Sequence, residues 1–309
     1  MTRRHQRGVA IITALLVVML AASIAAFLLA QQSQALTRTA RASERAQAAL
    51  YAAPTLDWAR EVLFRIQKWT PRGDLAQPWA QGLNAIPIDG AMASGAVRDD
   101  GGLFNLNNLV KNGVRSEPDM LVFGRLLTEL RLNPDLAQAV ADWIDADDEP
   151  NGSGGAENAT YLALPNPYRA ANQNLLQVEE LQRVRGFDGA TLSRLRPFVS
   201  ALPMRTPVNV NTAPQEVLAA IFPSLASDEI TALVKHRPFS DKAAIRKFLK
   251  DVPAASIDEA LDVESRFFSV TIAIDNAGTQ IRQSALLQRP PGFGSEVARW
   301  PSIIWVRTD

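Results

Sequence analysis

The chain of 309 residues is long enough to bury one or two hydrophobic cores. Its 32 basic and 32 acidic residues give a formal net charge of +0, so no overall positive field favours nucleic acid as a partner. The absence of cysteine excludes disulfides, thiolate metal sites and a cysteine nucleophile, and it leaves a metal held by oxygen ligands as the available internal cross-link.

Residues 9–30 contain no charged side chain and follow a leader that has Arg3, Arg4 and Arg7 but no acid. At about 1.5 Å per residue, a helix over this segment would be about 33 Å long, enough to cross the hydrocarbon core of a membrane. The basic leader places the N-terminus on the cytoplasmic side. A secretory signal peptide would have a small-residue cleavage site after the apolar segment, but here the boundary residue is Gly8, which lies before it.

This order of basic leader, glycine and apolar helix resembles the class III signal of type IV pilins and pseudopilins. The resemblance implies that residues 1–8 are a leader, that prepilin peptidase cleaves between Gly8 and Val9, and that Val9 is then N-methylated. It also implies that residues 9–30 remain as a single-pass anchor in the bacterial inner membrane. The alternative is a plain signal anchor with an incidental glycine.

One departure from the pilin pattern is informative. Most members have glutamate at the fifth mature position, where it is thought to pair with the N-terminal amine of a neighbouring subunit, and this chain has Thr13 there. An unpaired amine inside an apolar filament is costly, so loss of the glutamate fits a subunit that has no subunit ahead of it. Among pseudopilins, this loss is typical of minor pseudopilin K of type II secretion.

The anchor helix is expected to continue into the polar compartment, because residues 31–53 are rich in good helix formers. Pro54 should kink or interrupt it. Beyond Pro54, apolar residues at helical spacing predict an amphipathic helix: Leu56, Ala59, Leu63 and Ile66. The pilin resemblance implies that this helix lies on a small sheet. Residues 70–95 are rich in proline and glycine and predict loops with short extended pieces.

Phe104 and Leu106 flank turn-forming residues and predict a strand that ends in a tight turn. The run FNLNNL at 104–109 resembles a segment of the K pseudopilins.

Residues 116–262 show an almost wholly helical pattern. A capping box from Ser116 to Asp119 begins one helix, and Asn133 with Pro134 begins another. Further helices are expected at 177–186, 190–200, 213–222, 227–236 and 240–250, several of them with cap-type residues: Thr212, Ser227 and Ser240. Short connections make this segment an α domain of its own.

The last segment changes to a period of two. Residues 267–274 and 280–287 alternate around turn formers at 275–278, which predicts a hairpin, and residues 301–307 predict an edge strand. The expected fold is therefore α+β, with a long N-terminal transmembrane helix and a pilin-like domain that contains an antiparallel sheet. That domain comprises 31–115 and 263–309 and is interrupted by a large all-α insertion, 116–262, which is the architecture of the K pseudopilins.

An acidic run without lysine or arginine contains six acids: Asp142, Asp145, Asp147, Asp148, Glu149 and Glu157. Asp145 ends an apolar helix, where carboxylates face the unfavourable end of the helix dipole, and a glycine-rich turn then leads to Glu157. Carboxylates this close repel one another, so a cation is expected to bind between them. Ligands that are all oxygen favour a hard ion such as Ca²⁺. The EF-hand pattern is not matched, since Pro150 occupies its glycine position. A solvated, disordered loop is the alternative.

K pseudopilins have a closely similar stretch in a calcium-binding α domain. The matching runs here are DWIDAD at 142–147, GAEN at 155–158 and PYRAAN at 167–172. The calcium ligands that we expect are Asp145, Asp147 and Glu157, with Asp148 and Asn172 as further candidates. Where the family has aspartate after the glutamate, this chain has Asn158, which removes one charge and keeps a carbonyl oxygen.

Residues 208–221 resemble the opening of a helix-hairpin-helix unit, which binds DNA phosphates through hairpin amides. Asn211 and Thr212 should cap a helix that starts at Pro214. The hairpin glycines are absent, and the acidic pair at 228–229 would repel phosphate. The NVNTAP run also occurs in the α domain of K pseudopilins, so helix packing is the preferred interpretation and we expect no nucleic-acid binding.

Motifs for catalysis are lacking. The only histidines are His5 and His236, and neither a Gly-x-Ser-x-Gly elbow nor a Gly-Lys-Ser/Thr phosphate loop occurs. The acidic run could supply a glycosidase-like pair of catalytic carboxylates, but no aromatic cleft motif accompanies it. We therefore expect a protein that is not an enzyme.

Four motifs in family order (class III signal, FNLNNL, acidic loop, NVNTAP) resemble the minor pseudopilin K family of type II secretion, also called general secretion pathway protein K. The resemblance implies a subunit at the tip of the pseudopilus, with its C-terminal domain in the periplasm. Such a subunit initiates assembly with minor pseudopilins I and J, the major pseudopilin, prepilin peptidase and the inner-membrane assembly platform, for protein export across the outer membrane. The alternatives are a minor type IV pilin of an adhesive fibre and a membrane-anchored helix-hairpin-helix DNA-binding competence protein.

Overall fold

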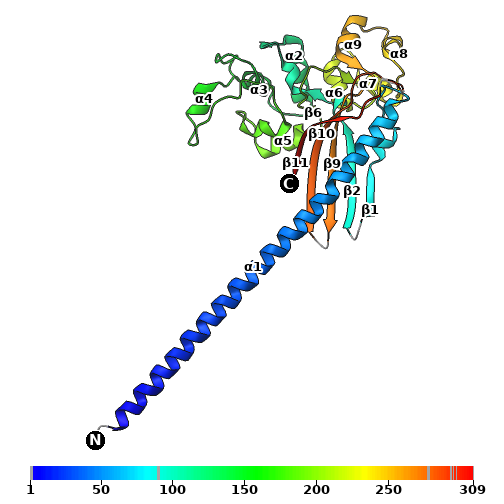
Figure 1. Cartoon of the computed structure of the whole chain (residues 1–309). Helices are drawn as coiled ribbons and strands as arrows, with labels where there is room; N and C mark the ends of the chain where they lie inside the picture. The colour runs from blue at the N-terminus through cyan, green and yellow to red at the C-terminus, as the bar shows by residue number, and fades with distance from the viewer. Residues whose placement is uncertain are drawn as a thin grey trace.

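The computed structural model describes residues 3–88, 91–276, 279–292, 294, 296 and 298–308. One long helix, α1 (Arg3–Gln67), projects with its N-terminal half away from the rest of the chain (Figure 1). From Ile12 to Ala40 this helix is long and apolar enough to cross a membrane, with a mean hydropathy of 2.7 and none of its most apolar window buried. The predicted anchor at 9–30 therefore lies in the part of α1 whose described side chains, from residue 12 onward, are exposed.

The C-terminal part of α1 packs on a sheet. Leu56, Ala59 and Leu63 are buried there, as their helical spacing predicts. Of the two outcomes predicted for Pro54, a kink or an interruption, the interruption does not occur, because α1 continues through Pro54 to Gln67. The carbonyl that loses its hydrogen-bond partner to this proline belongs to Leu50, whose side chain is 72% exposed, so water can hydrate that carbonyl.

The sheet has five strands in the order β1-β2-β9-β10-β11, and each neighbouring pair is antiparallel. The strands are β1 (Leu83–Ile88), β2 (Ala91–Asp99), β9 (Phe267–Asn276), β10 (Thr279–Gln288) and β11 (Ser302–Thr308). The predicted hairpin is β9 with β10, and the predicted edge strand is β11. Residues 277–278 of the predicted turn lie outside the described residues.

Strands β1 and β2 come from a segment that the sequence predicts as loops with short extended pieces. They form longer strands because β9, far away in sequence, supplies the hydrogen-bonding partner of β2 over residues 92–99. Small residues such as Ala93 and Gly95 in β2 give little local strand signal.

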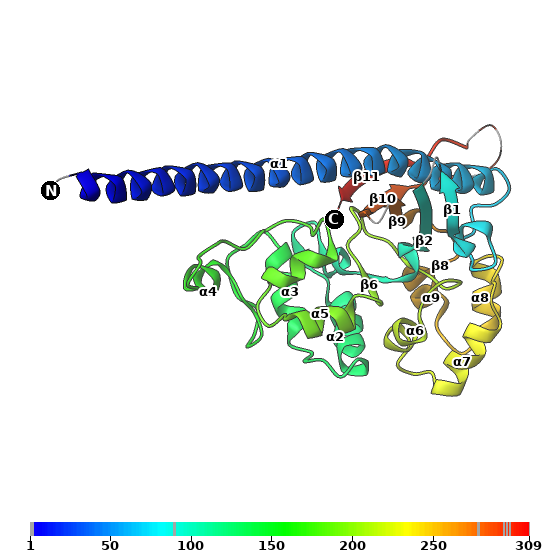
Figure 2. The ribbon, with the colours of Figure 1, turned by 90° about the horizontal axis from the view of Figure 1, so that it is seen from below.

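Alternation of side chains divides the sheet into two faces. Phe268, Val270 and Ile272 of β9 are buried against α1, and the intervening Ser269 and Thr271 face the other side. The helical part of the chain lies on that other side and at the end of the sheet remote from the N-terminus, as the two views together show (Figures 1 and 2).

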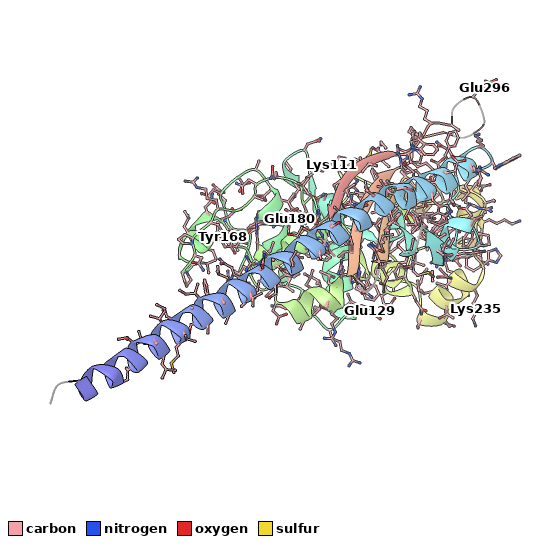
Figure 3. All side chains as sticks on the ribbon, turned by 60° about the horizontal axis from the view of Figure 1, so that its bottom comes forward. Lys111, Glu129, Tyr168, Glu180, Lys235 and Glu296 are labelled. Carbon is pink, nitrogen blue, oxygen red and sulfur yellow. The ribbon has the colours of Figure 1, made fainter. Side chains whose placement is uncertain are left out.

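The segment predicted as an α domain folds into short helices. They are α2 (Glu117–Glu129), α3 (Leu136–Ile144), α4 (Asn158–Leu162), the 3₁₀ helix η4 (Val178–Arg183), α5 (Gly189–Leu195), α6 (Gln215–Ile221), α7 (Ser227–Lys235), α8 (Lys242–Phe248) and α9 (Ala254–Ala260). Their shared core includes Phe123, Leu126 and Val140, and the ring of Phe104 stacks on that of Phe123 at 5.4 Å between centroids. The domain is elongated, with Tyr168 and Lys235 towards its two ends (Figure 3).

Short strand pairs and 3₁₀ turns complete the fold. The pairs are β3 (Phe104–Asn105) with β6 (Val199–Ser200), β4 (Val110–Lys111) with β5 (Val114–Arg115), and β7 (Val208–Asn209) with β8 (Leu261–Asp262). The 3₁₀ turns are η1 (Pro78–Gln81), η2 (Asp100–Gly102) and η3 (Leu106–Leu109). As predicted, the strand at Phe104 ends in a tight turn.

Several predicted helix caps are wrong. Ser116 makes no bond to a helix amide, and its Oγ donates instead to Asp119 Oδ2 at 2.5 Å. Ser227 is the first residue of α7 rather than its cap, and α8 is capped by Asp241, the residue after the predicted Ser240.

The two polar residues predicted to cap α6 are used elsewhere. The side chain of Asn211 exchanges two hydrogen bonds with the backbone of Phe239, at 2.7 and 3.0 Å. The hydroxyl of Thr212 donates to Asp99 Oδ2 at 2.6 Å. Helix α6 begins after Pro214 without a side-chain cap because tertiary contacts have taken both groups.

Candidate metal centre

The acidic run begins where helix α3 ends. The amide of Asp145 closes the last turn by donating to Ala141 O at 2.9 Å, and Asp145 itself is extended, with φ −68° and ψ 173°. The buried side chains of Val140 and Trp143 fix the helix in the core, so the position of Asp145 is fixed too.

Asp142 organises the loop that follows. Its Oδ1 accepts a hydrogen bond from Asn151 Nδ2 at 2.8 Å, and its Oδ2 accepts from the backbone amides of Asn151 (3.1 Å) and Ala156 (2.8 Å). A Cβ on Gly155 would collide with Asp142 Oδ2, so glycine is needed for this close approach. This role was not predicted from the sequence, although the position of Asp142 in the last turn of the apolar helix is a signal for burial.

Three of the predicted ligands are brought together. Asp145, Asp147 and Glu157 each place one carboxylate oxygen within 4.8 Å of the others. Asp145 and Glu157 are only 3% and 2% exposed, whereas Asp147 is exposed. Asp145 Oδ1 and both oxygens of Glu157 are buried and accept no hydrogen bond from the described part of the chain.

The electrostatics of this group are unfavourable for the charged forms. Burial, reinforced by the neighbouring carboxylates of Asp142 and Asp145, raises the pKa of Glu157 to about 8. Burial, with the charges of Asp147 and Asp142, raises the pKa of Asp145 to about 6. A cation among these oxygens would remove both penalties.

Asn172 contributes a fourth oxygen to the region. Its Nδ2 donates to Asp147 O at 3.0 Å and its amide donates to Trp143 O at 3.0 Å, so it ties the acidic loop to the end of α3. Its Oδ1 is buried and accepts no hydrogen bond from the described residues. Asp148 is placed differently, because its Oδ1 accepts from the amide of Asn158 at 3.1 Å, at the start of α4.

The loop is anchored rather than solvated freely. Arg185 Nη1 donates to Gly155 O at 3.0 Å, and the Arg185 amide donates to the hydroxyl of Tyr161 at 3.3 Å. The ring of Tyr161 packs edge-on against Trp143, with 5.1 Å between centroids. Buried carboxylate oxygens without partners, held by a fixed frame, fit a hard cation that takes oxygen ligands.

The FNLNNL run is a buried structural element. Asn105, Asn107 and Asn108 are at most 6% exposed. The amide group of Asn107 donates to the carbonyls of Leu175 and Leu202, both at 2.9 Å, and its oxygen accepts from the Leu175 amide at 2.9 Å. These asparagines therefore satisfy the backbone of distant loops, as buried polar groups must.

The NVNTAP run meets the end of β2 in a second buried network. Asp99, which is 3% exposed, accepts at Oδ2 from Asn209 Nδ2 (2.9 Å), Thr212 Oγ1 (2.6 Å) and Ser265 Oγ (2.5 Å). Burial raises the pKa of Asp99, and these hydrogen bonds oppose the shift. The run thus joins the sheet to the helical domain, and the acidic residues Asp228 and Glu229 stand exposed at the start of α7 beside it.

Comparison with known proteins gives a consistent result. Two family models described as type II secretion system protein K match residues 102–204 and 208–271. The chain is 33% identical over 307 residues to the type II secretion system protein K of Pectobacterium carotovorum subsp. carotovorum, covering 92% of this chain and 93% of that protein. It is 35% identical over 282 residues to the Pseudomonas aeruginosa protein K, covering 87% and 84%.

A solved structure is similar over most of the chain. The match is to the crystal structure of the GspK-GspI-GspJ complex from the enterotoxigenic Escherichia coli type 2 secretion system, with a TM-score of 0.77 and 26% identity. It covers 88% of this chain and 99% of the matched chain.

Proposed function

Since the chain belongs to the type II secretion system protein K family, which makes it a minor pseudopilin, we propose that it occupies the tip of the pseudopilus and primes its assembly. The observation that carries this proposal is the position of the helical domain. The domain lies beyond the sheet at the end opposite the membrane helix (Figure 1). A subunit stacked further along the axis of α1 would collide with it, whereas a terminal position leaves it free.

The partners in this proposal are minor pseudopilins I and J. The relative of known structure forms a complex with GspI and GspJ, and this chain has the same fold over 88% of its length. The exposed half of α1 offers the apolar surface along which pilin-type helices associate in a fibre, with Leu15, Val18 and Leu29 each more than half exposed.

Membrane insertion and processing complete the pathway. Residues 9–30 would anchor the chain in the inner membrane, with the domain in the periplasm, after prepilin peptidase has cleaved between Gly8 and Val9 and Val9 has been methylated. Mass spectrometry of the chain taken from its native membrane tests this step, with a methylated N-terminus at Val9 as the expected result. An intact Met1, or an N-terminus beyond Ala30, would contradict it.

Calcium has a structural role in this account. Asp145, Asp147 and Glu157 would hold the ion, with the oxygen of Asn172 as a further ligand and Asp148 next to them. The ion supplies positive charge that removes the repulsion among the carboxylates and fixes the loop to α3. The family is a structural component of a secretion apparatus, and we assign no catalytic step to the chain.

The priming role is tested by counting pseudopili. In cells that express the major pseudopilin with I- and J-type subunits, we expect few surface fibres without this chain and many with it. Equal fibre numbers in both strains would contradict priming. Co-purification with I- and J-type subunits distinguishes this function from that of a minor pilin of an adhesive fibre, and salt-sensitive DNA binding by the purified chain would favour the competence protein instead.

A further inference from the structure

A polar cleft separates the sheet from the helical domain, and no contact in the proposed function uses it. Its floor is the sheet face that points away from α1, and its wall is formed by residues 176–179 together with Arg196, Ser200 and Ala201. One cavity there has a volume of about 340 Å³, and a second of about 480 Å³ continues it along the strands. The two share Arg196, Thr271 and Arg307, so they form one elongated groove, which we call the sheet–domain cleft.

The cleft has an excess of positive charge in a chain whose net charge is +0. Four arginines line it, with only two carboxylates: Arg98, Arg196, Arg282 and Arg307, against Asp100 and Glu179. Arg98 is paired with Asp100 at 2.8 Å.

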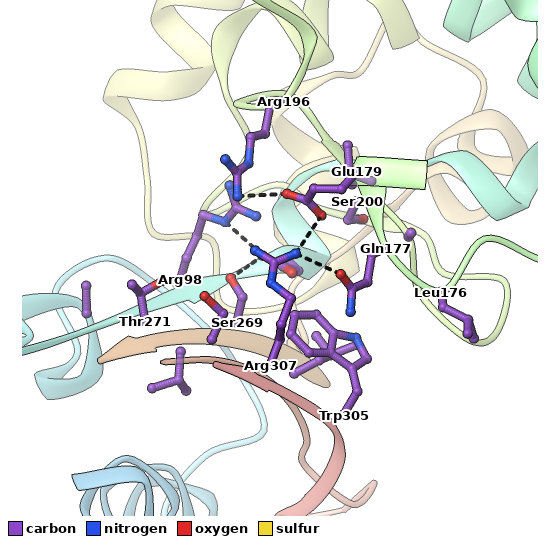
Figure 4. Close-up of a pocket in the computed structure, with 17 residues that line it drawn as sticks. Arg98, Leu176, Gln177, Glu179, Arg196, Ser200, Ser269, Thr271, Trp305 and Arg307 are labelled. Carbon is purple, nitrogen blue, oxygen red and sulfur yellow. Dashed lines mark hydrogen bonds and ion pairs between the residues drawn. The ribbon is translucent and has the colours of Figure 1, made fainter. Parts of the chain in front are cut away.

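Glu179 forms ion pairs with two arginines, Arg196 and Arg307. Arg196 Nη2 lies 2.8 Å from its Oε1, and Arg307 Nη1 lies 3.9 Å from its Oε2 while donating to Gln177 Oε1 at 2.9 Å (Figure 4). Arg282 is exposed and forms no ion pair with the described residues. Among the residues that line the cleft, arginines therefore outnumber carboxylates, and Arg282 is the arginine without an ion pair to the described residues.

Two buried donor groups also line the cleft without a partner among the described residues. They are the hydroxyl of Ser200, in a residue that is 1% exposed, and the indole Nε1 of Trp305. Buried donors are normally satisfied, so these two groups leave hydrogen-bonding capacity that a bound molecule could use. Figure 4 shows Ser200, Trp305 and Arg307 among the residues that line the cleft, Ser200 from β6 and Trp305 from β11.

The floor of the cleft determines the shape of the occupant. Its side chains along β2, β9 and β10 are small: Ser94, Ala96, Thr271, Ala273 and Ser284. A floor of small side chains lets a polypeptide backbone approach closely, and the groove follows the strands for the combined length of two cavities. Arginines above such a floor favour carboxylates, which they can bind through paired hydrogen bonds.

We propose that the sheet–domain cleft binds an extended acidic peptide segment of a partner protein. The carboxylates of that segment pair with Arg282, Arg196 and Arg307, and its oxygens accept from Ser200 and Trp305. This binding site is independent of the tip position and of the calcium site.

Fluorescence polarisation with a fluorescein-labelled peptide of eight glutamates tests the proposal, using the full chain in a non-ionic detergent. We expect saturable binding that weakens with salt, and no binding of the matching peptide of eight glutamines. The variants Arg282→Gln and Trp305→Phe should each weaken binding about three- to tenfold, because each removes a donor group while keeping much of the side chain.

Arg194→Gln is the matched control, since Arg194 is exposed on α5 and lies outside the cleft. It removes one positive charge and should leave the affinity unchanged within about twofold. Equal losses for Arg194→Gln and Arg282→Gln would overturn the proposal, because they would indicate a nonspecific charge effect.

Two further measurements distinguish peptide binding from other causes of a change in fluorescence polarisation. Free glutarate at the same carboxylate concentration should not displace the peptide, because a multivalent chain gains from linked contacts. Displacement by glutarate would overturn the peptide assignment in favour of a small-anion site. Binding that requires calcium would also overturn it, since the peptide would then be bridged to the acidic loop at 145–157.

Discussion

At the scale of single residues, the acidic loop combines burial with missing partners. Both oxygens of Asp142 accept hydrogen bonds from loop groups, whereas neither oxygen of Glu157 accepts one from the described residues. The difference matters because a buried carboxylate without hydrogen bonds or a counter-charge is strongly destabilising. An ion that binds the folded chain would convert this cost into stabilisation.

The first prediction concerns calcium and melting. At calcium 100 times above its dissociation constant, linkage gives about 2.7 kcal/mol, and we expect the melting temperature to rise by about 5–10 °C. Glu157→Gln and Asp145→Asn should each reduce this rise to less than half, as measured by circular dichroism with chelator and with added calcium. Glu149→Gln is the control, because Glu149 is exposed in the same loop and lies outside the three-carboxylate group. An equal loss of the calcium response in Glu149→Gln would contradict the ligand assignment.

The second prediction concerns pH in the absence of metal. The pKa of Glu157 is raised from 4.5 to about 8, so between these values the folded chain binds a proton that the unfolded chain has lost. Stability from this group is complete below about 4.5 and is lost as the pH rises towards 8. Asp145, with its pKa raised to about 6, contributes in the same direction up to that pH.

In chelator, the melting temperature of the wild type should therefore fall between pH 5 and pH 8 relative to that of Glu157→Gln, which cannot titrate there. Saturating calcium should abolish the difference in slope, since the ion stabilises the charged form. A wild type whose melting temperature rises relative to the variant over this range would show that Glu157 is not buried without a partner.

At the scale of secondary-structure elements, the junction between sheet and helical domain depends on buried polar networks. Asp99 ends β2 and accepts hydrogen bonds from three donors in two other segments: Asn209 and Thr212 of the NVNTAP run, and Ser265. Replacing one donor leaves a buried carboxylate less satisfied, and such a loss costs about 1–3 kcal/mol.

The third prediction follows for Thr212→Val, which keeps the shape of the side chain and removes its hydroxyl. We expect a loss of about 1–3 kcal/mol in the free energy of unfolding, measured by urea denaturation. Thr128→Val is the control, because Thr128 is exposed on α2 and its hydroxyl bonds only to Gly124 O within that helix. Equal losses in both variants would show that the Asp99 network adds nothing to the junction.

These elements also show what the sequence can and cannot predict. Amphipathic periodicity placed the helices that contain Leu63, Phe123 and Val140, and alternation placed the β9–β10 hairpin, because each pattern is local. Strand β2 was not predicted as a full strand because its partner β9 is more than 150 residues away. Helix α9 was not predicted either, since Ile257 is the one residue of that helix buried in the core.

The predicted grouping of acidic residues is confirmed, whereas several of the predicted helix caps are wrong. Asp145, Asp147 and Glu157 lie together, as the acidic pattern predicted, because helix α3 and the glycine-rich turn are both readable from sequence. Asn211 and Thr212 carry good cap chemistry, but Phe239 and Asp99 compete for their polar groups from distant segments. Competition of that kind cannot be read from a local window.

At the scale of the whole molecule, one continuous helix connects an apolar segment long enough to cross a membrane to the sheet and its helical domain. Helix α1 covers 65 residues, which corresponds to about 98 Å at about 1.5 Å per residue. Its exposed half is long enough to span a bilayer, and its buried half fixes the orientation of the sheet. The helical domain is thus held at a defined end of a rigid rod, and this geometry is the basis of the proposed tip position.

The location of the helical domain on assembled fibres tests the tip position most directly. An epitope inserted after Gly152, in the acidic loop, would disturb the metal site, so the better position is next to Lys235, at the exposed end of α7. Gold-labelled antibody against that epitope, on pseudopili sheared from cells, should mark one end of each fibre and nowhere else. Label distributed along the fibre length would contradict the account, because the helical domain would then fit between stacked subunits.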